Sequence, residues 1–250
     1  MGGCISIERI ISKLDEHLGR NDYASAERHL LYWLDEAETA GDFRTELLMR
    51  NELMGLYRKT ARREEALACV EKSCQRIDEL SISHQVGAAT TYLNAATVYK
   101  AFGMPEKSIP LFERARGTYE SDLDKNDSRL GGLYNNMALA LVDLGSFGEA
   151  KELYEKAIGI MQSTQGGDLE VAITYLNMAS AAEAELGALE ADGLICDYLE
   201  RAREILEAHT PRDGYYAFVC EKCASVFGYY GYFAYKSELE ARSGGIYEGN

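Results

Sequence analysis

The sequence predicts an all-α protein, a right-handed α-solenoid of about six antiparallel helix pairs, and three observations lead to this prediction. The 250 residues include only three prolines, and proline is the residue that helix interiors exclude most strongly. Apolar residues recur at positions i, i+3, i+4 and i+7, which is the spacing of one buried helix face. A similar segment returns about every 42 residues, as expected of a repeat architecture.

Three segments carry the repeat most clearly, and each is predicted to lie in the first helix of a pair. They read Tyr92-Leu-Asn-Ala-Ala96, Tyr134-Asn-Asn-Met-Ala138 and Tyr175-Leu-Asn-Met-Ala179. Their final alanines fall 42 and 41 residues apart. In the central copy the expected buried stripe consists of Tyr134, Met137, Ala138 and Leu141.

A turn and a second helix follow each first helix. In the central copy the turn is Leu144-Gly145-Ser146-Phe147, and its glycine is suited to end a helix. Small residues on the facing helices would let them approach closely, while aromatic side chains fill the gaps between successive pairs. The second-helix face of this copy is predicted to be Phe147, Ala150, Tyr154, Ala157 and Ile158. Its small residue recurs at spacings of 40, 42 and 42 as Ala26, Ala66, Ser108 and Ala150.

The pattern weakens toward both ends of the sequence. One copy earlier it uses Leu53, Met54, Tyr57, Ala66 and Val70, and the earliest copy uses Tyr23, Ala26, Leu30 and Trp33. After Ala179 the second helix is expected to be displaced by about four residues, with Leu199 and Ala202 in the packing positions. The last pair would use Ala224, Phe227, Gly231 and Phe233. We therefore predict one domain over 1–250, with a divergent first pair at 1–40, clear repeats at 42–208 and a degenerate capping pair at 211–250.

These residue types resemble the tetratricopeptide repeat: an aromatic residue, a small residue, a glycine turn, then alanine, aromatic and alanine. The standard repeat has 34 residues, and the period near 42 is similar to the longer repeat of kinesin light chains. Residues 170–179 resemble that family's Val-Ala-x-Thr-x-x-Asn-x-Ala opening, and residues 109–115 resemble its Pro-Leu-x-x-Arg-Ala second helix. Pro110 is expected near the N-terminal turn of its helix, where a missing N–H costs little.

Composition excludes several classes of partner and location. The chain has 26 basic and 41 acidic residues, a net charge of −15, which argues against nucleic acid as a partner. No apolar run reaches the roughly 20 residues that a membrane span needs, and a secretory signal is not recognisable at the N-terminus. Six cysteines in 250 residues are too sparse for a disulfide framework. A cytoplasmic location is predicted.

The first six residues, Met1-Gly2-Gly3-Cys4-Ile5-Ser6, allow two interpretations. They fit the N-myristoylation pattern at Gly2, with Cys4 as a palmitate acceptor. Alternatively, they lead into an ordinary first helix whose apolar stripe comprises Ile5, Ile7, Ile10, Ile11 and Leu14.

Motifs that carry chemistry are weak in this sequence. Cys220-Glu-Lys-Cys223 is the only C-x-x-C, and a zinc site would need a second pair of ligands that the neighbouring sequence lacks. We expect both cysteines to be reduced, buried and free of metal, like other small core residues. The four histidines are scattered, and no phosphate-binding glycine loop occurs. The prediction is a non-enzyme without cofactor or metal.

Aromatic residues crowd the C-terminal segment, with nine tyrosines and phenylalanines between Tyr215 and Tyr235. In one interpretation they cap the last buried interface while their hydroxyls reach water. In the other they form a surface for self-association or for a partner, because tyrosine is enriched at interfaces.

The resemblance to kinesin light chains also implies a binding site. In that family, asparagines on the concave side of the first helices grip the backbone of an extended peptide, and Asn94, Asn136 and Asn177 match them. An amide both donates and accepts hydrogen bonds, so it can satisfy any peptide group. The other interpretation is that each asparagine is solvated or bonds a neighbouring helix. The complete set of peptide-binding candidates is Asn94, Asn136, Asn177, Arg58, Lys100, Thr97 and Asn51.

Two functions follow from this site. The favoured one is a non-catalytic scaffold that binds a protein or an extended peptide in a concave groove. Arg58, Lys59 and Lys100 lie toward its N-terminal half, where an acidic segment of a partner would be attracted. The alternative is a peptide-sensing regulatory protein that changes curvature on binding. We expect such a sensor to carry an additional output module, and the repeats fill the given sequence.

Overall fold

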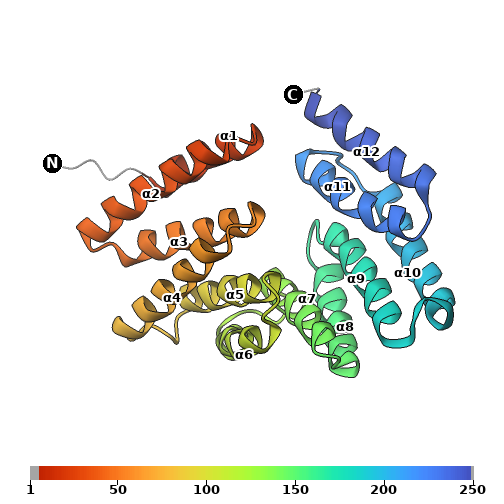
Figure 1. Ribbon diagram of the computed structural model, residues 1–250, viewed down its shortest axis with the longest axis horizontal. Helices are drawn as coiled ribbons and strands as arrows, with labels where there is room; N and C mark the ends of the chain where they lie inside the picture. Colours follow the sequence, from red (N-terminus) through yellow and green to blue (C-terminus); the bar gives the residue numbers. More distant parts are fainter. Residues whose placement is uncertain (1–5, 249–250) are drawn as a thin grey trace. The chain divides into compact units, whose positions relative to one another are not determined.

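A computed structural model describes residues 6–248, and it contains twelve α-helices and no strand over that range. The chain divides into two compact units, residues 1–123 and 124–250. The helices of each unit are shown in chain order in Figure 1. Unit 1 contains α1 (Ile7–Gly19), α2 (Tyr23–Ala40), α3 (Phe43–Lys59), α4 (Arg63–Glu79), α5 (Val86–Ala101) and α6 (Pro105–Asp122). Unit 2 contains α7 (Ser128–Asp143), α8 (Phe147–Ser163), α9 (Asp168–Leu186), α10 (Ala188–Ala208), α11 (Gly214–Tyr229) and α12 (Phe233–Glu248).

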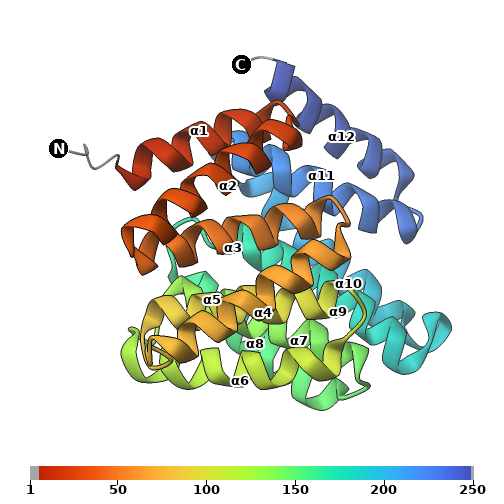
Figure 2. The ribbon, with the colours of Figure 1, turned by 60° about the vertical axis from the view of Figure 1, so that its left-hand side comes forward.

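Consecutive helices pack as pairs, and each pair also touches the next one within its unit. In unit 1, α3 packs on α4 and α5 on α6, while α3 also contacts α5 (Figure 2). In unit 2 the pairs are α7 with α8, α9 with α10 and α11 with α12, and α9 contacts both α7 and α11. The first helices α3 and α5 of unit 1, and α7, α9 and α11 of unit 2, are therefore neighbours, as expected of an all-α repeat fold.

The small residues predicted at the helix contacts are fully buried. Ala96, Ala138 and Ala179 of the first helices have no exposed surface. The same holds for the second-helix residues Ala26, Ala66, Ser108 and Ala150. The predicted stripe of Tyr134, Met137, Ala138 and Leu141 is also buried. The repeat register derived from the sequence is confirmed over these helices.

Helix α10, the second helix of the fifth pair, keeps the repeat register and is longer than the second helix α8. Ala191, which lies 41 residues after Ala150, is fully buried and continues the series of small residues. Leu199 and Ala202 are fully buried as well, at the displaced positions that the sequence predicted. Helix α10 has 21 residues and α8 has 17, so α10 contains one additional turn. The longer helix buries both the residue in register, Ala191, and the residues at the displaced positions, Leu199 and Ala202.

Every turn within a pair contains a residue with positive φ. The six positions are separated by 40, 42, 42, 42 and 44 residues, and they are Asn21, Ala61, Gly103, Gly145, Gly187 and Gly231. Glycine tolerates such a backbone at no steric cost, whereas a residue with a Cβ does not. Ala61 (φ 55°) therefore occupies a position that the repeat otherwise gives mainly to glycine.

Replacing Ala61 with glycine should stabilise the protein. The Ala61 side chain is exposed, so no packing is lost, and the relief of the left-handed strain outweighs the added freedom of the unfolded chain. We expect the free energy of unfolding to rise by about 1 kcal/mol, measured by denaturant titration. Ala184→Gly, in a regular and exposed part of α9, should instead lower it by a similar amount. A loss of stability in Ala61→Gly would contradict this account of the turn.

Pro110 lies deeper in its helix than the sequence suggested. Pro105 occupies the first helical position of α6, and Pro110 is inside the helix, one turn further on. A proline there leaves one carbonyl of the preceding turn without its helical partner. The motif at 109–115 thus lies in a second helix, as expected. Its proline, however, lies about one turn beyond the N-terminal positions at which a missing N–H costs little.

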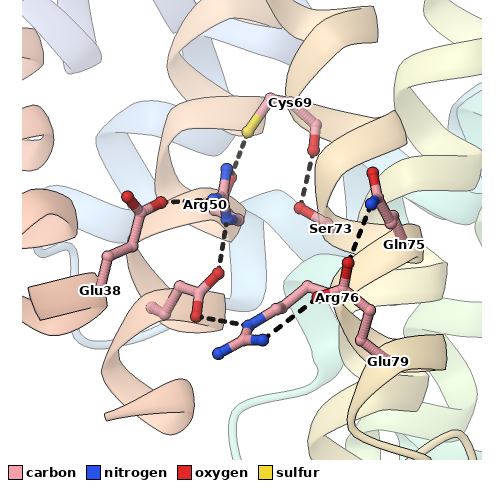
Figure 3. Close-up of polar contacts among 8 residues, drawn as sticks. Glu38, Arg50, Cys69, Ser73, Gln75, Arg76 and Glu79 are labelled. Carbon is pink, nitrogen blue, oxygen red and sulfur yellow. Dashed lines mark hydrogen bonds and ion pairs between the residues drawn. The ribbon is translucent and has the colours of Figure 1, made fainter. Parts of the chain in front are cut away.

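A network of ion pairs around the buried Glu46 joins three helices of unit 1. The Glu46 side chain on α3 is 3% exposed and pairs with Arg50 (3.3 Å) and with Arg76 of α4 (2.9 Å). Arg50 also contacts Glu38 of α2 at 2.5 Å, and Arg76 contacts Glu79 at 3.2 Å (Figure 3). Because removal of Glu46 would leave the buried Arg50 without its buried partner, the network helps to hold α2, α3 and α4 together.

The contact at Ala138 can be tested by enlarging the side chain. Ala138→Leu adds three carbons where no surface is exposed, and overpacking of this kind costs roughly 1–3 kcal/mol. We expect that loss in the free energy of unfolding, followed by circular dichroism. Ala184→Leu is the matched control because Ala184 is exposed on α9; its stability should change by less than about 0.5 kcal/mol. An unchanged melt for Ala138→Leu would show that the helix contact is assigned to the wrong residue.

None of the helices in the described part of the chain is long and apolar enough to span a membrane. The proposed lipidation sites Gly2 and Cys4 lie outside the described residues.

Candidate functional site

In unit 1 the candidate residues lie on two neighbouring first helices. Asn51 and Arg58 belong to α3, whereas Asn94, Thr97 and Lys100 belong to α5. The Asn51 amide donates a hydrogen bond to Thr91 Oγ1 at 3.2 Å, which links α3 to α5. The Thr97 hydroxyl donates to the Leu93 carbonyl of its own helix at 2.8 Å. Asn94, Thr97 and Lys100 are half-buried. This arrangement brings the face of α3 that holds Asn51 against α5.

A cleft of about 420 Å³ opens between the N-terminal halves of α3 and α5. Its walls are mainly apolar, and Arg44 lies among its lining residues. Asn51 also lines it, and the Oδ1 atom of this amide is buried without a hydrogen-bond partner in the described structure. The apolar lining comprises Phe43, Leu47, Leu48, Ile82, Val86 and Ala88. The cleft therefore has a mainly apolar interior, with the Asn51 amide in its wall.

Charges on the α3 face are mixed rather than uniformly basic. Arg58 is exposed, and desolvation by the surrounding protein lowers its pKa. Glu52, the position one repeat before Asn94, is half-buried; burial and the nearby Asp15 raise its pKa. Lys59 lies 5.3 Å from the centre of the Tyr23 ring. Two carboxyl groups thus accompany the cations that the sequence identified.

In unit 2 the two candidate asparagines make internal hydrogen bonds. Asn136 donates to the carbonyl of Gly132 on its own helix at 2.8 Å. Asn177 donates to Oδ1 of Asn135 at 3.1 Å, which connects α9 to α7. Both side chains are half-buried. Each amide still has its carbonyl oxygen and a second N–H, because an asparagine can make about four hydrogen bonds.

The sequence analysis missed side chains that connect successive first helices. Asn135 is one of them. It lies 42 residues before Asn177, and this spacing of one repeat could have indicated their contact. Three tyrosine–glutamate contacts are others. Tyr215 donates to Glu170, while Tyr229 and Tyr230 donate to the two oxygens of Glu183 at 3.0 and 2.8 Å. These pairs are 45 to 47 residues apart, so the constant spacing of 42 did not reveal them.

The C-terminal aromatic residues divide into a buried group and an exposed group. Tyr216 and Phe227 are fully buried, and Tyr235 is 6% exposed, so they form part of the core of unit 2. Tyr215, Phe218, Tyr229 and Phe233 are exposed. Burial and the bond to Glu183 raise the pKa of Tyr230 to about 12. The segment therefore both caps the core and presents aromatic rings to solvent.

Cys220 and Cys223 are buried, at 0% and 1% exposure, as the sequence predicted. Both are free thiols. Desolvation raises the pKa of both and brings that of Cys223 to about 12. Since the thiolate is the reactive form, these two side chains are unreactive core groups in the folded protein.

A thiol reagent should therefore distinguish the cysteines. At neutral pH we expect exposed Cys196 to react rapidly with a disulfide reagent such as DTNB, and Cys220 and Cys223 to react only on unfolding. The Cys196→Ser variant serves to assign the fast phase. Rapid labelling of Cys220 or Cys223 in the native protein, mapped by peptide mass, would contradict their burial, and so would stoichiometric zinc by elemental analysis.

His209 forms a pair with one carboxylate. The His209 ring contacts Asp168 at 2.6 Å and stacks on Tyr216, with ring centres 5.6 Å apart. Within residues 6–246, no three His, Cys, Asp or Glu side chains converge as a metal site would require. The described side chains thus offer hydrogen-bonding surfaces and clefts on the first helices.

Comparison with protein families identifies one repeat directly. Residues 132–162, which include most of α7 and α8, match the model of the tetratricopeptide repeat. None of the curated proteins matches the sequence.

Solved structures of similar fold include two of the kinesin light chain type. The crystal structure of BtubC (BKLC) from P. vanneervenii has a TM-score of 0.67 and 20% identity, covering 82% of each chain. A structure of kinesin light chain nearly identical TPR-like repeats from Podosopora anserina has a TM-score of 0.56 and 16% identity, covering 81% of this chain and 95% of that one. NprR in complex with its cognate peptide NprX has a TM-score of 0.57 and 18% identity, covering 99% and 72%. The fold of this chain is a TPR-like helical repeat fold.

Proposed function

We propose that the protein is a non-catalytic scaffold that binds an extended segment of another protein on the exposed faces of its first helices. The observation that carries the proposal is the equivalent placement of Asn94, Asn136 and Asn177 on α5, α7 and α9, half-buried at one position of the repeat. The TPR-like fold supports it, because stacked helix pairs create extended surfaces of this kind.

The chemistry of these amides suits a peptide backbone. Asn136 and Asn177 each use one N–H internally, which holds the side chain in place at little further entropic cost. Their carbonyl oxygens can then accept hydrogen bonds from peptide N–H groups whatever the side chains of the partner are. Asn51 and Thr97 support the face through contacts within unit 1. Arg58 and Lys100 would attract an acidic segment to that unit.

A peptide-sensing role is the second candidate. It is favoured by the match to NprR, a structure solved with a bound peptide, which extends over 99% of this chain. The α1–α2 pair keeps the repeat position at Ala26 rather than forming a separate bundle, and this supports the scaffold instead. A sensor would change the arrangement of its helices on binding. Small-angle X-ray scattering with and without a bound peptide can detect such a change.

Substitution of the asparagines tests the scaffold. Peptides selected from a random library against the wild-type protein should bind Asn94→Ala/Asn136→Ala/Asn177→Ala about two orders of magnitude more weakly, at about 1 kcal/mol for each amide. Asn126→Ala, in the exposed α6–α7 loop, is the matched control and should bind like the wild type. Acidic peptides among them should also lose affinity in Arg58→Glu/Lys100→Glu, most strongly at low salt. Equal affinity of the triple variant and the control would exclude the asparagine site.

A further inference from the structure

The exposed side of α11 presents a continuous stripe of aromatic and polar side chains. Tyr215, Phe218, Lys222, Ser225 and Tyr229 follow one another at spacings of three and four residues, and all five are exposed. Residues at these spacings lie on one face of a helix. Tyr229 is 70% exposed, and with Tyr215 and Phe218 it places three aromatic rings on one exposed face. We call these five residues the α11 stripe.

Two carboxylates of α9 flank the stripe. Glu170, near the start of α9, accepts from Tyr215, and Glu183, near its end, accepts from Tyr229 and Tyr230. These donors are neutral phenols, so they position the carboxylates without cancelling their charge. Neither glutamate forms an ion pair within residues 6–246. Two fixed negative charges therefore lie beside exposed aromatic rings.

The stripe already holds one cation of its own. The Lys222 ammonium lies 4.5 Å from the centre of the Phe218 ring, and Phe218 stacks on Tyr215. A cation over an aromatic face is attracted by the electron density of the ring. Lys222 is exposed and comes from the same helix, so an external basic side chain could replace it without disturbing the core.

The charge of unit 2 is consistent with such a ligand. It contains 10 basic and 21 acidic residues, a net charge of −11, whereas unit 1 has 16 and 20, a net charge of −4. A field of this sign attracts cationic segments and repels acidic ones.

We propose that the α11 stripe and the two glutamates of α9 bind a basic extended segment of a partner protein, and that Lys222 competes with it. The segment contributes Lys or Arg side chains that contact Glu170 and Glu183 and stack on Tyr215, Phe218 or Tyr229. This inference rests on the proposed function, in which first-helix faces hold an extended chain, and it adds the chemistry of the ligand for unit 2.

The positions of the glutamates set the spacing of the basic residues. Glu170 and Glu183 are 13 residues apart on one helix, which corresponds to about 20 Å at 1.5 Å per residue. An extended chain advances about 3.3 Å per residue, so about six residues cover this distance. The preferred ligand has two basic residues about six positions apart.

Labelled dodecapeptides of glycine and serine provide the probe. One carries two arginines six positions apart, a second carries them adjacent, and a third carries two glutamates in place of the spaced arginines. Fluorescence anisotropy at low ionic strength should give the highest affinity for the first peptide and no detectable binding of the third. Glu170→Gln/Glu183→Gln keeps the phenol contacts and should weaken the first peptide by about tenfold.

Two matched controls separate the site from net charge. Glu152→Gln/Glu155→Gln alters two exposed glutamates of α8 and changes the net charge equally, yet should change affinity by less than about twofold. Lys222→Gln should strengthen binding severalfold, since the competing cation is removed, whereas Lys125→Gln, an exposed lysine of the α6–α7 loop, should have little effect.

Several outcomes would overturn the inference. The first is equal weakening by the two glutamine pairs, and the second is equal binding of the spaced and adjacent arginines. A third is a dimer by sedimentation that Phe218→Ala dissociates, because a second copy would then cover the stripe. Library peptides that lose affinity in Asn136→Ala/Asn177→Ala but not in Glu170→Gln/Glu183→Gln would leave the proposed function standing while excluding this ligand.

Discussion

The close approach of the two helices in each pair is the constraint on which the rest of the structure depends. At the contact, the second helices carry nothing larger than serine, and these positions have no exposed surface from Ala26 to Ala191. The helix axes can come only as near as these side chains permit. The space left beside them is filled by large rings such as Tyr92, Tyr119 and Tyr154, which are almost fully buried. Small residues therefore occupy the points where the two helices touch, and aromatic residues fill the space beside them. The alternation recurs because every pair has the same helix-to-helix contact.

The turns within the pairs keep the small residues at the same position of each second helix. In the first four pairs the residue with positive φ precedes the buried small residue by five positions, as Gly145 precedes Ala150, and in the fifth pair Gly187 precedes Ala191 by four. A left-handed residue ends one helix sharply, so the next helix starts at a defined point. The turn thus determines which face of the second helix meets the first. Ala61 shows that the backbone conformation is retained even where the side chain opposes it.

Packing was predictable from the sequence because it depends on residue size at a regular spacing. The buried alanines, the stripe around Tyr134 and the burial of Cys220 and Cys223 all followed from that rule. Polar contacts between neighbouring helices were not predictable, because they depend on side-chain reach rather than on spacing. Asn177 donates a hydrogen bond to Asn135, and Glu183 accepts hydrogen bonds from Tyr229 and Tyr230, whose segment matched the repeat poorly. The extra turn of α10 shifts α11 along the sequence, so the contacts of Glu183 with Tyr229 and Tyr230 depart from the fixed period. The candidate site was therefore predictable as a set of positions on first helices, whereas its internal hydrogen bonds were not.

The two units differ in the kind of recognition that their surfaces favour. Unit 1 offers an apolar cleft lined in part by Asn51, and its α3 helix carries the acidic Glu52 as well as the basic Arg58 and Lys59. Binding in this cleft would depend mainly on shape and on hydrogen bonding. Unit 2 offers carboxylates that are held by phenols and are not neutralised. Binding there would depend on charge and should weaken as salt screens it. An aromatic ring keeps its attraction for a cation when its hydroxyl donates to a carboxylate. In the proposed site, each tyrosine of this surface would therefore both position a charge and contact the basic ligand.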